Sequence, residues 1–281
     1  MKMTQDKKVA LVAGASGIIG QQLSQALVAD QWQVTALTHQ SDLAISGTEV
    51  IAVDLRDVQQ SHERLASLTD VTHIFYSAWL NAADWASMVG PNLAMLQNLV
   101  QTLENIAPLE HVSLMQGYKV YGAHLGRFKT PARESDPGVP GAEFNAAQLN
   151  WLSAQQQGKA WHWSAPRPGV VGSDRSGNVM NLALSLAIYA SICRAAQLPL
   201  RFPGSLETWN SMVDFTDAAL LADATIWAAR NADARNQAFN INNGDLWRWS
   251  ELWPVIAEWF ALDIAPPVSL SFRQMFRDYR T

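Results

Sequence analysis

A glycine-rich turn near the N-terminus constrains the fold of this chain more than any other feature. The turn, Gly14-Ala-Ser-Gly17-Ile-Ile-Gly20, lies between an apolar segment at residues 8–13 and a helix-like segment at residues 20–29. Between a strand and a helix, the first glycine of such a motif permits a tight turn, the second lets the backbone approach a pyrophosphate, and the third allows close helix packing. The helix N-terminus then attracts phosphate through its free N–H groups and its dipole. The motif therefore predicts a dinucleotide-binding site rather than a plain structural turn.

Strand-like and helix-like segments alternate along the chain. Strands are expected at residues 8–13, 33–37, 50–53, 73–77, 111–115 and 161–164. Helices are expected at residues 20–29, 92–105, 181–196, 217–229 and 250–260. This alternation is typical of βαβ units that build a parallel sheet with helices on both faces. We therefore expect an α/β fold, with a Rossmann-type doubly wound parallel sheet in residues 1–168 and a smaller, mainly helical C-terminal substrate region, interleaved with it, in residues 169–281.

Composition and charge limit the partners and the compartment. The formal net charge of −5 argues against a nucleic-acid partner, because phosphate binding needs a basic surface. No segment reaches the roughly 18 uncharged apolar residues of a membrane span, and residues 1–8 lack the apolar stretch of a secretory signal. Cys193 is the one cysteine, which favours a reducing compartment and a buried, inert thiol. We expect a cytoplasmic protein with neither a nucleic-acid nor a membrane partner.

The end of the second predicted strand bears on the choice of cofactor. An acidic residue at this place normally binds the ribose 2′-hydroxyl and repels a 2′-phosphate. The segment Thr38-His-Gln-Ser41 instead offers hydrogen-bond donors and no carboxylate, which favours NADP, although NAD stays open because the segment contains no arginine. After the third strand, Asp54 and Leu55 are candidates to hold the adenine edge, with a helix N-cap as the alternative for Asp54.

Longer stretches match a known family. They comprise the glycine motif and residues 71–79, 95–98, 111–122, 163–169, 180–181, 189–193, 199–204, 226–229, 236–240 and 243–245, together with Asn92. In these stretches the chain resembles the progesterone 5β-reductase/iridoid synthase-like enzymes, which are atypical extended short-chain dehydrogenase/reductases of the NAD-dependent epimerase/dehydratase superfamily. As a family they use NADPH to reduce the double bond of an enone or enal. The resemblance therefore implies an NADPH-dependent oxidoreductase acting on an activated double bond or carbonyl of a small apolar substrate.

The resemblance also assigns catalytic positions. It implies that the functional lysine of the family is Lys119, which follows the fifth predicted strand, where a cation would stabilise charge developing on a carbonyl oxygen. The family's tyrosine falls at Ala146, and the Tyr-x-x-x-Lys signature is absent from the chain. If the strand continues past residue 115, alternation of its side chains places Tyr121, but not Tyr118, on the same side as Lys119. Tyr121 is therefore a candidate hydrogen-bond donor to the substrate. A role in packing is the alternative for this residue.

The motifs and the resemblance together give the expected binding sites. The residues expected to bind the cofactor are Gly14, Ser16, Gly17, Ile18, Ile19, Gly20, Thr38, His39, Gln40, Asp54, Leu55, Ser77, Ala78, Trp79, Gln116, Lys119, Pro168 and Val171. The residues expected to line the substrate pocket are Trp79, Met115, Tyr118, Phe128, Ala146, Met180 and Trp209, with core packing as the alternative for the large apolar ones. The Pro- and Gly-rich loop at residues 122–141 is expected to form part of the substrate-side wall. No metal is expected, and a homodimer stays open.

Two other functions compete with the reductase. A non-catalytic NAD(P)-binding or redox-sensing protein of the same fold would explain the alanine at position 146. A nucleotide-sugar epimerase or dehydratase shares the fold, but the absent Tyr-x-x-x-Lys signature and the scarcity of basic residues in the substrate half disfavour it.

Overall fold

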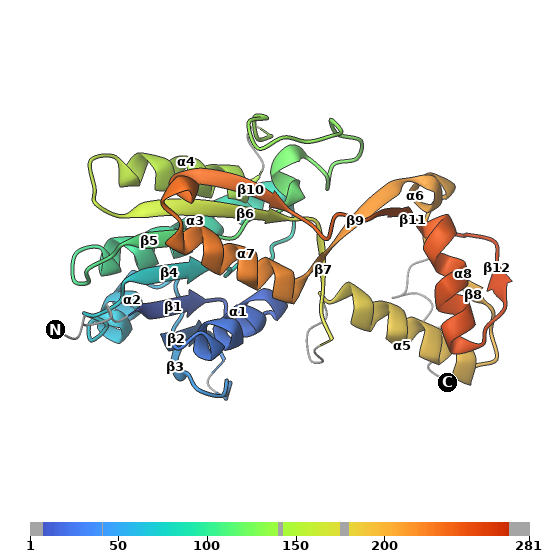
Figure 1. Cartoon of the computed structure of the whole chain (residues 1–281), viewed down its shortest axis with the longest axis horizontal. Coiled ribbons are helices and arrows are strands. Elements are labelled where there is room, and N and C mark those ends of the chain that lie inside the picture. The colour runs from blue at the N-terminus through green and yellow to red at the C-terminus, as the bar shows by residue number, and fades with distance from the viewer. Residues whose placement is uncertain (1–7, 41, 140–142, 175–179, 270–281) are drawn as a thin grey trace. The chain divides into compact units, whose positions relative to one another are not determined.

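The computed structural model describes residues 8–40, 42–139, 143–174 and 180–269 (Figure 1). It divides the chain into two compact units. Unit 1 consists of Met1–Gly169 and Ala218–Ile241, and unit 2 consists of Val170–Asp217 and Asn242–Thr281. The chain therefore leaves unit 1, returns to complete it, and ends in unit 2.

Unit 1 is built on a seven-stranded sheet with the order β10-β6-β5-β4-β1-β2-β3 (Figure 1). The strands are β1 (Val9–Ala13), β2 (Gln33–Thr38), β3 (Glu49–Ala52), β4 (His73–Tyr76), β5 (His111–Leu114), β6 (His162–Pro168) and β10 (Gln237–Ile241). All the pairings between them are parallel. This order, in which the chain winds outward from β1 in both directions, is that of the doubly wound Rossmann fold. The predicted fold class is confirmed.

Helices cover both faces of this sheet. They are α1 (Ile18–Ala29), α2 (Val58–Leu65), α3 (Trp85–Leu103), α4 (Phe144–Gln156) and α7 (Ala218–Arg230), with the 3-10 helices η1 (Tyr118–Tyr121) and η2 (Ala232–Ala234). Successive side chains of a strand point to opposite faces. Leu11 of β1 accordingly packs in a core cluster that contains Leu99 of α3. Its neighbour Val12 packs in a second cluster, with Leu23 of α1 and Ile226 of α7.

Several elements of unit 1 differ from their predicted extents, and the following differences have a local physical cause. The helix predicted at residues 92–105 begins earlier, at Trp85, because the Asp84 carboxylate caps it by accepting a hydrogen bond of 2.8 Å from the Ser87 N–H. The short helix α2 has no predicted counterpart, since it buries only Ser61 and Leu65 and so lacks an apolar stripe. Strand β6 extends beyond the predicted end at residue 164, because β10 pairs with it along this stretch.

Unit 2 combines short strands with helices around an aromatic core. Its elements are β7 (Val170–Gly172), α5 (Leu182–Ala195), β8 (Leu200–Arg201), α6 (Leu206–Asn210), β9 (Met212–Asp217), β11 (Leu246–Arg248), α8 (Trp249–Phe260) and β12 (Ile264–Ala265). Phe202 lies at the centre of the core, with ring-centroid distances of 5.2 Å to Trp253 and 5.3 Å to Trp249. Cys193 of α5 is buried against this cluster, as the sequence predicts.

Candidate active site

The glycine turn after β1 has the shape that its sequence predicts. Gly14 has a φ of +82°, a conformation that other residues rarely adopt, and a Cβ atom there would lie 2.6 Å from the backbone nitrogen of Ala78. A Cβ atom at Gly20 would overlap the Gly14 carbonyl oxygen. Gly17 is less crowded, with its imagined Cβ 3.3 Å from the same oxygen. The turn therefore needs glycine at its first and last positions for packing alone.

The N-terminus of α1 is open to an anion. Gly17 is the N-cap residue in an extended conformation, and no side chain caps the helix. Side chains bind carbonyl groups of the turn and leave the N–H groups at the start of α1 uncapped. Gln21 Nε2 donates to the Ser16 carbonyl at 3.0 Å, and Ser77 Oγ donates to the Ala13 carbonyl at 2.9 Å. Backbone N–H groups at an uncapped helix N-terminus bind phosphate readily. Ile18 and Ile19, the first residues of α1, supply such groups.

The ends of β2 and β3 lie side by side, because Val53 N–H donates to the Thr38 carbonyl at 2.8 Å. Beyond β3, the Asp54 carboxylate accepts a hydrogen bond of 2.9 Å from Arg56 Nε. This contact with Arg56 lowers the pKa of Asp54, and His39 after β2 lowers it further. Arg56 therefore brings a guanidinium to Asp54, which also interacts electrostatically with His39 after β2.

The alternative role considered for Asp54 is wrong. The N-cap of α2 is Asp57, whose carboxylate accepts a hydrogen bond of 3.0 Å from the Gln60 N–H. Asp54 lies one turn earlier, so its carboxylate is engaged by Arg56 and not by a helix N-terminus.

Lys119 lies beyond the carboxyl end of β5, in the 3-10 helix η1. Its Nζ atom lies 4.8 Å from the ring centroid of Trp85 and 5.5 Å from that of Trp79. Burial lowers the pKa of the Lys119 ammonium, and the carboxylate of Glu143 opposes this shift. The site therefore holds a half-buried cation between two indole rings, with a buried carboxylate near it.

The strand-alternation argument for Tyr121 is wrong. Strand β5 ends at Leu114, and residues 118–121 are helical, so alternation along a strand does not apply to them. The Tyr121 hydroxyl donates to Asn240 Oδ1 at 2.7 Å and accepts from Arg167 Nη1 at 2.8 Å. A hydroxyl already engaged by two side chains favours the packing role of this residue. The neighbouring Tyr118 packs against it, with ring centroids 6.0 Å apart.

Ala146 lies in the first turn of α4, next to a buried acidic cap. Glu143 is the N-cap residue, and its carboxylate accepts hydrogen bonds from the Ala146 N–H at 2.9 Å and from Asn145 Nδ2 at 2.7 Å. The side chain of Gln116, after β5, donates to the Asn145 carbonyl at 2.7 Å. These bonds tie the start of α4 to the end of β5. The Ala146 methyl group brings no polar atom to this place.

The described part of the 122–141 loop, residues 122–139, is anchored to the edge strand of the sheet. Asn240 of β10 donates two hydrogen bonds to this loop: its N–H to Glu134 Oε1 at 2.8 Å, and its Nδ2 to the Ala132 carbonyl at 3.1 Å. Arg167 of β6 donates to the Glu134 carbonyl at 3.1 Å. Phe128 lies half-buried in this loop, and Met115, directly after β5, is also half-buried.

Three of the predicted site residues belong to unit 2. Val171 lies in β7, Met180 is about half exposed just before α5, and Trp209 packs on Phe202 in the aromatic core, with ring centroids 5.2 Å apart. The packing of Trp209 accords with the alternative considered for the large apolar residues. The remaining predicted residues lie in unit 1, and most of them follow the carboxyl ends of its parallel strands.

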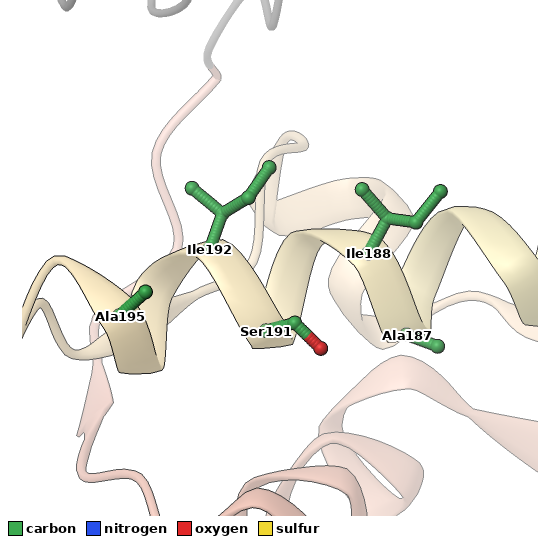
Figure 2. A pocket seen from close by; sticks show the side chains of 5 residues that line it. All are labelled: Ala187, Ile188, Ser191, Ile192 and Ala195. Carbon is green, nitrogen blue, oxygen red and sulfur yellow. The ribbon is translucent and has the colours of Figure 1, made fainter.

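Unit 2 has apolar cavities of its own. One, of about 390 Å³, lies among α5, β9, β11 and α8. Another, of about 340 Å³, is a shallow hollow on α5, where Ile188 and Ile192 project from the same side of the helix (Figure 2). None of the described residues that line them is a lysine, histidine or tyrosine. Among the described residues that line them, Asp245 at the 390 Å³ cavity is the one with a side chain that acid–base chemistry uses.

The described residues contain neither a cluster of metal ligands nor a helix that could span a membrane. Nowhere in residues 8–40, 42–139, 143–174 and 180–269 do three histidine, cysteine or acidic side chains gather as metal ligands would. No helix within the same residues has the length and apolar character that crossing a bilayer requires.

A doubly wound parallel sheet with an uncapped glycine turn after its first strand defines a Rossmann-type protein. Within that class, the chain belongs to the family of PRISE-like Rossmann-fold domains, which it matches over residues 10–271. It is 34% identical to an (S)-8-oxocitronellyl enol synthase of Camptotheca acuminata, over 92% of this chain and 70% of that protein. It is 33% identical, over the same shares, to a 3-oxo-Delta(4,5)-steroid 5-beta-reductase of Arabidopsis thaliana.

Solved structures share the fold. The UDP-glucose 4-epimerase of Thermus thermophilus, solved in complex with NAD, superposes with a TM-score of 0.73 at 20% identity, over 97% of this chain and 93% of that one. A UDP-N-acetylglucosamine 4-epimerase of Methanobrevibacter ruminantium gives a TM-score of 0.76 at 20% identity, over 95% of this chain and 86% of that one. The family resemblance, the extended short-chain dehydrogenase/reductase fold and the oxidoreductase class expected from the sequence are confirmed.

The sequence reasoning missed three groups of this site. Neither Glu143 nor Arg56 belongs to a recognisable motif. The only signals are that Glu143 directly precedes a helix and that Arg56 shortly follows a strand. Trp85, which contacts Lys119, lies ahead of the predicted helix, so no pattern places it near the site.

Proposed function

We propose that the protein is an NADPH-dependent reductase of the activated double bond, or of the carbonyl, of a small apolar enone or enal. The observation that carries this proposal is the place of Lys119. Its half-buried ammonium follows β5 at the same sheet edge at which the glycine turn follows β1, because the strands are parallel. Ligands of doubly wound sheets bind at this edge. The reductase and enol synthase names of the relatives support the same chemistry.

The residues present fit a dinucleotide. The crowded glycines Gly14 and Gly20 bring backbone close to the uncapped end of α1, where a pyrophosphate would accept hydrogen bonds. The donors of Thr38, His39 and Gln40, together with Arg56, suit a 2′-phosphate more than a bare ribose. When bound, NADPH supplies the hydride that the β-carbon of the substrate accepts. The other residues that we propose to bind the cofactor are those given for it in the sequence analysis.

The catalytic group that the protein supplies in this proposal is the ammonium of Lys119. Addition of hydride to the β-carbon moves the double-bond electrons toward the carbonyl oxygen, which becomes an enolate. The Lys119 ammonium stabilises that negative charge, which is absent from the ground state, so its contribution lowers the barrier. One proton from solvent completes the reduction. The indole rings of Trp79 and Trp85 exclude water from one side of the ammonium and so strengthen its electrostatic effect.

A second candidate function rests on a specific observation. The methyl group of Ala146 stands where the family's tyrosine is expected, and the hydroxyl of Tyr121 is engaged by Asn240 and Arg167. A protein that binds NAD(P) without hydride transfer, as a redox sensor or a structural cofactor carrier, needs no donor at either place. We keep this function as the alternative.

One experiment separates the two functions. NADPH consumption is followed with a panel of small enals and enones, and product analysis distinguishes reduction of the double bond from that of the carbonyl. We expect slow, measurable reduction by the wild type. Gly17→Asp, which puts a carboxylate at the pyrophosphate-binding turn, should abolish NADPH binding in titrations while the variant stays folded. If the wild type and Ala146→Tyr both bind NADPH tightly and reduce nothing, the non-catalytic alternative is the correct one.

A further inference from the structure

A histidine lies against the same indole ring as Lys119. His124 follows η1 in the 122–141 loop, and its ring packs on Trp85 with centroids 4.3 Å apart and planes inclined by 59°. The Nζ atom of Lys119 lies 4.8 Å from the centroid of that indole. Trp85 therefore forms an aromatic wall shared by an ammonium group and an imidazole.

Both ring nitrogens of His124 are shielded from solvent, and neither has a hydrogen-bond partner among the described residues. A neutral imidazole carries one donor and one acceptor, and leaving such groups buried and unpaired is energetically unfavourable. Two other histidines of unit 1 avoid this cost: His111 Nε2 lies 2.9 Å from Ser164 Oγ, and His73 Nδ1 lies 2.8 Å from Thr72 Oγ1. A buried polar group without a partner beside a candidate active site points to a ligand.

Burial favours the neutral form of His124. Burial lowers the pKa of the imidazole, and the Lys119 ammonium on η1 lowers it further, whereas the Glu143 carboxylate at the start of α4 raises it. Trp85, the neighbour on α3, is uncharged. A neutral imidazole keeps one N–H and has no charge of its own, so it can donate a hydrogen bond to an oxygen without repelling Lys119.

We propose that His124 binds the carbonyl oxygen of the substrate through this N–H, as a second donor beside Lys119. It thereby supplies the hydrogen bond that the alanine at position 146 cannot give. This inference rests on the proposed reductase function. His124 transfers no proton in the step: its hydrogen bond strengthens as the carbonyl oxygen becomes an enolate, and the proton still comes from solvent.

Matched variants test the role of the N–H. His124→Phe keeps an aromatic ring against Trp85 and removes the donor, whereas His124→Gln keeps an N–H donor. His162→Phe is the control, because His162 also has a buried ring nitrogen without a partner among the described residues, but it begins β6 at the opposite edge of the sheet. We expect kcat/KM for the best enal to fall on the order of a hundredfold in His124→Phe, to recover in part in His124→Gln, and to be unchanged in His162→Phe. Wild-type kcat/KM in a folded His124→Phe variant would overturn the inference.

A measurement without turnover separates this inference from the reductase proposal. Protein with ¹³C-labelled histidine, saturated with NADP⁺, is titrated with cyclohex-2-enone, and the His124 resonance is identified by its loss in His124→Phe. We expect a saturable shift of this resonance and no shift of the His162 resonance. If the protein reduces enals but the His124 resonance does not shift, His124 does not bind the carbonyl oxygen, whereas the reductase function is retained. A saturable shift without any reduction retains His124 as a carbonyl-binding residue and removes the reductase function.

Discussion

The backbone N–H of Ala146 donates a hydrogen bond of 2.9 Å to the carboxylate of Glu143, the residue that caps α4 and acts electrostatically on Lys119. The cap fixes position 146 in the first turn of the helix, close to the groups that surround the lysine. A side chain placed at this position is therefore held by the helix and not by a mobile loop.

The first prediction concerns this position. Ala146→Tyr restores the hydroxyl that the family resemblance leads one to expect, and we expect reduction of enals to rise by about one to two orders of magnitude, since one such donor is worth about 3 kcal/mol. Steady-state NADPH consumption measures the gain.

Ala147→Tyr is the matched control for this variant. It adds the same side chain to the same helix turn, but it projects about 100° further around the helix axis. An equal gain in both variants would mean that the hydroxyl acts through general effects on α4 and not as a donor to the substrate.

The second prediction concerns pH. Because burial lowers the pKa of Lys119, the ammonium loses its proton at a lower pH than the usual value of about 10.4. We expect kcat/KM to fall as pH rises through this lowered pKa. Lys119→Arg, which stays charged, should move the alkaline limb to higher pH, and Lys119→Met should lose on the order of a hundredfold in rate. A pH profile that is the same in the wild type and in Lys119→Arg would remove the ammonium from the reaction.

The third prediction concerns the choice of cofactor. The proposed preference for NADPH assigns the 2′-phosphate to Arg56, whose guanidinium is held by Asp54 after β3. We expect the wild type to bind NADPH more tightly than NADH, and Arg56→Ala to weaken NADPH binding about tenfold while NADH binding is unchanged. Fluorescence titration with each nucleotide measures both affinities.

Arg64→Ala serves as the control for Arg56→Ala, since Arg64 is a second exposed arginine close in sequence, in the last turn of α2. It should leave both affinities unchanged. Equal wild-type affinities for NADPH and NADH would mean that the residues after β2 and β3 do not recognise the 2′-phosphate.

The fourth prediction concerns stability. Burial lowers the pKa of His73 to about 4 and that of His111 to about 3, whereas an unfolded histidine titrates near pH 6.5. Below pH 6.5 the unfolded chain therefore takes up protons that the folded protein does not, so stability is full above this pH and falls as the pH drops toward 4. We expect each histidine to contribute a loss of about 2 kcal/mol in the free energy of unfolding at pH 5.

Urea unfolding at pH 7.5 and pH 5 measures this loss. His73→Phe removes the titrating group while keeping an aromatic ring at the position that contacts Trp32. The difference between the two pH values should be smaller by about 2 kcal/mol in this variant. A difference equal to that of the wild type would show that His73 takes up a proton in the folded state.

The glycine turn and the central strands could be predicted from short stretches of sequence. The glycine spacing predicts the turn at Gly14, whose positive φ and close approach to Ala78 leave no room for another residue. Apolar runs predict the central strands, because these are buried on both faces and so contain few polar residues. The three-residue strands β7 and β11 are too short to carry a period, and only their pairing with β9 defines them.

The site was harder to predict, because contacts distant in sequence shape it. In the stretch from His111 to Gly122, Gly117 is a possible end of the strand, but the aromatic and apolar residues after it would also suit a strand, and residues 118–121 are helical. Bonds from elsewhere direct the chain there: Gln116 N–H donates to the Pro166 carbonyl at 2.8 Å, and Val139 N–H to the Val120 carbonyl at 2.9 Å. Glutamate is not among the favoured N-cap residues, so the residue type at position 143 gives no capping signal.

The anchoring of the 122–141 loop by Asn240 has a consequence for the order in which the protein matures. On the ribosome, the glycine turn and the strands β1 to β6 are synthesised well before β10, so the nucleotide-binding edge can assemble on the nascent chain. In the loop that follows Lys119, Ala132 and Glu134 cannot accept hydrogen bonds from Asn240 until residue 240 has left the exit tunnel. The glycine turn is thus able to form before this loop is anchored, and a nascent chain that has acquired the first does not yet have the second.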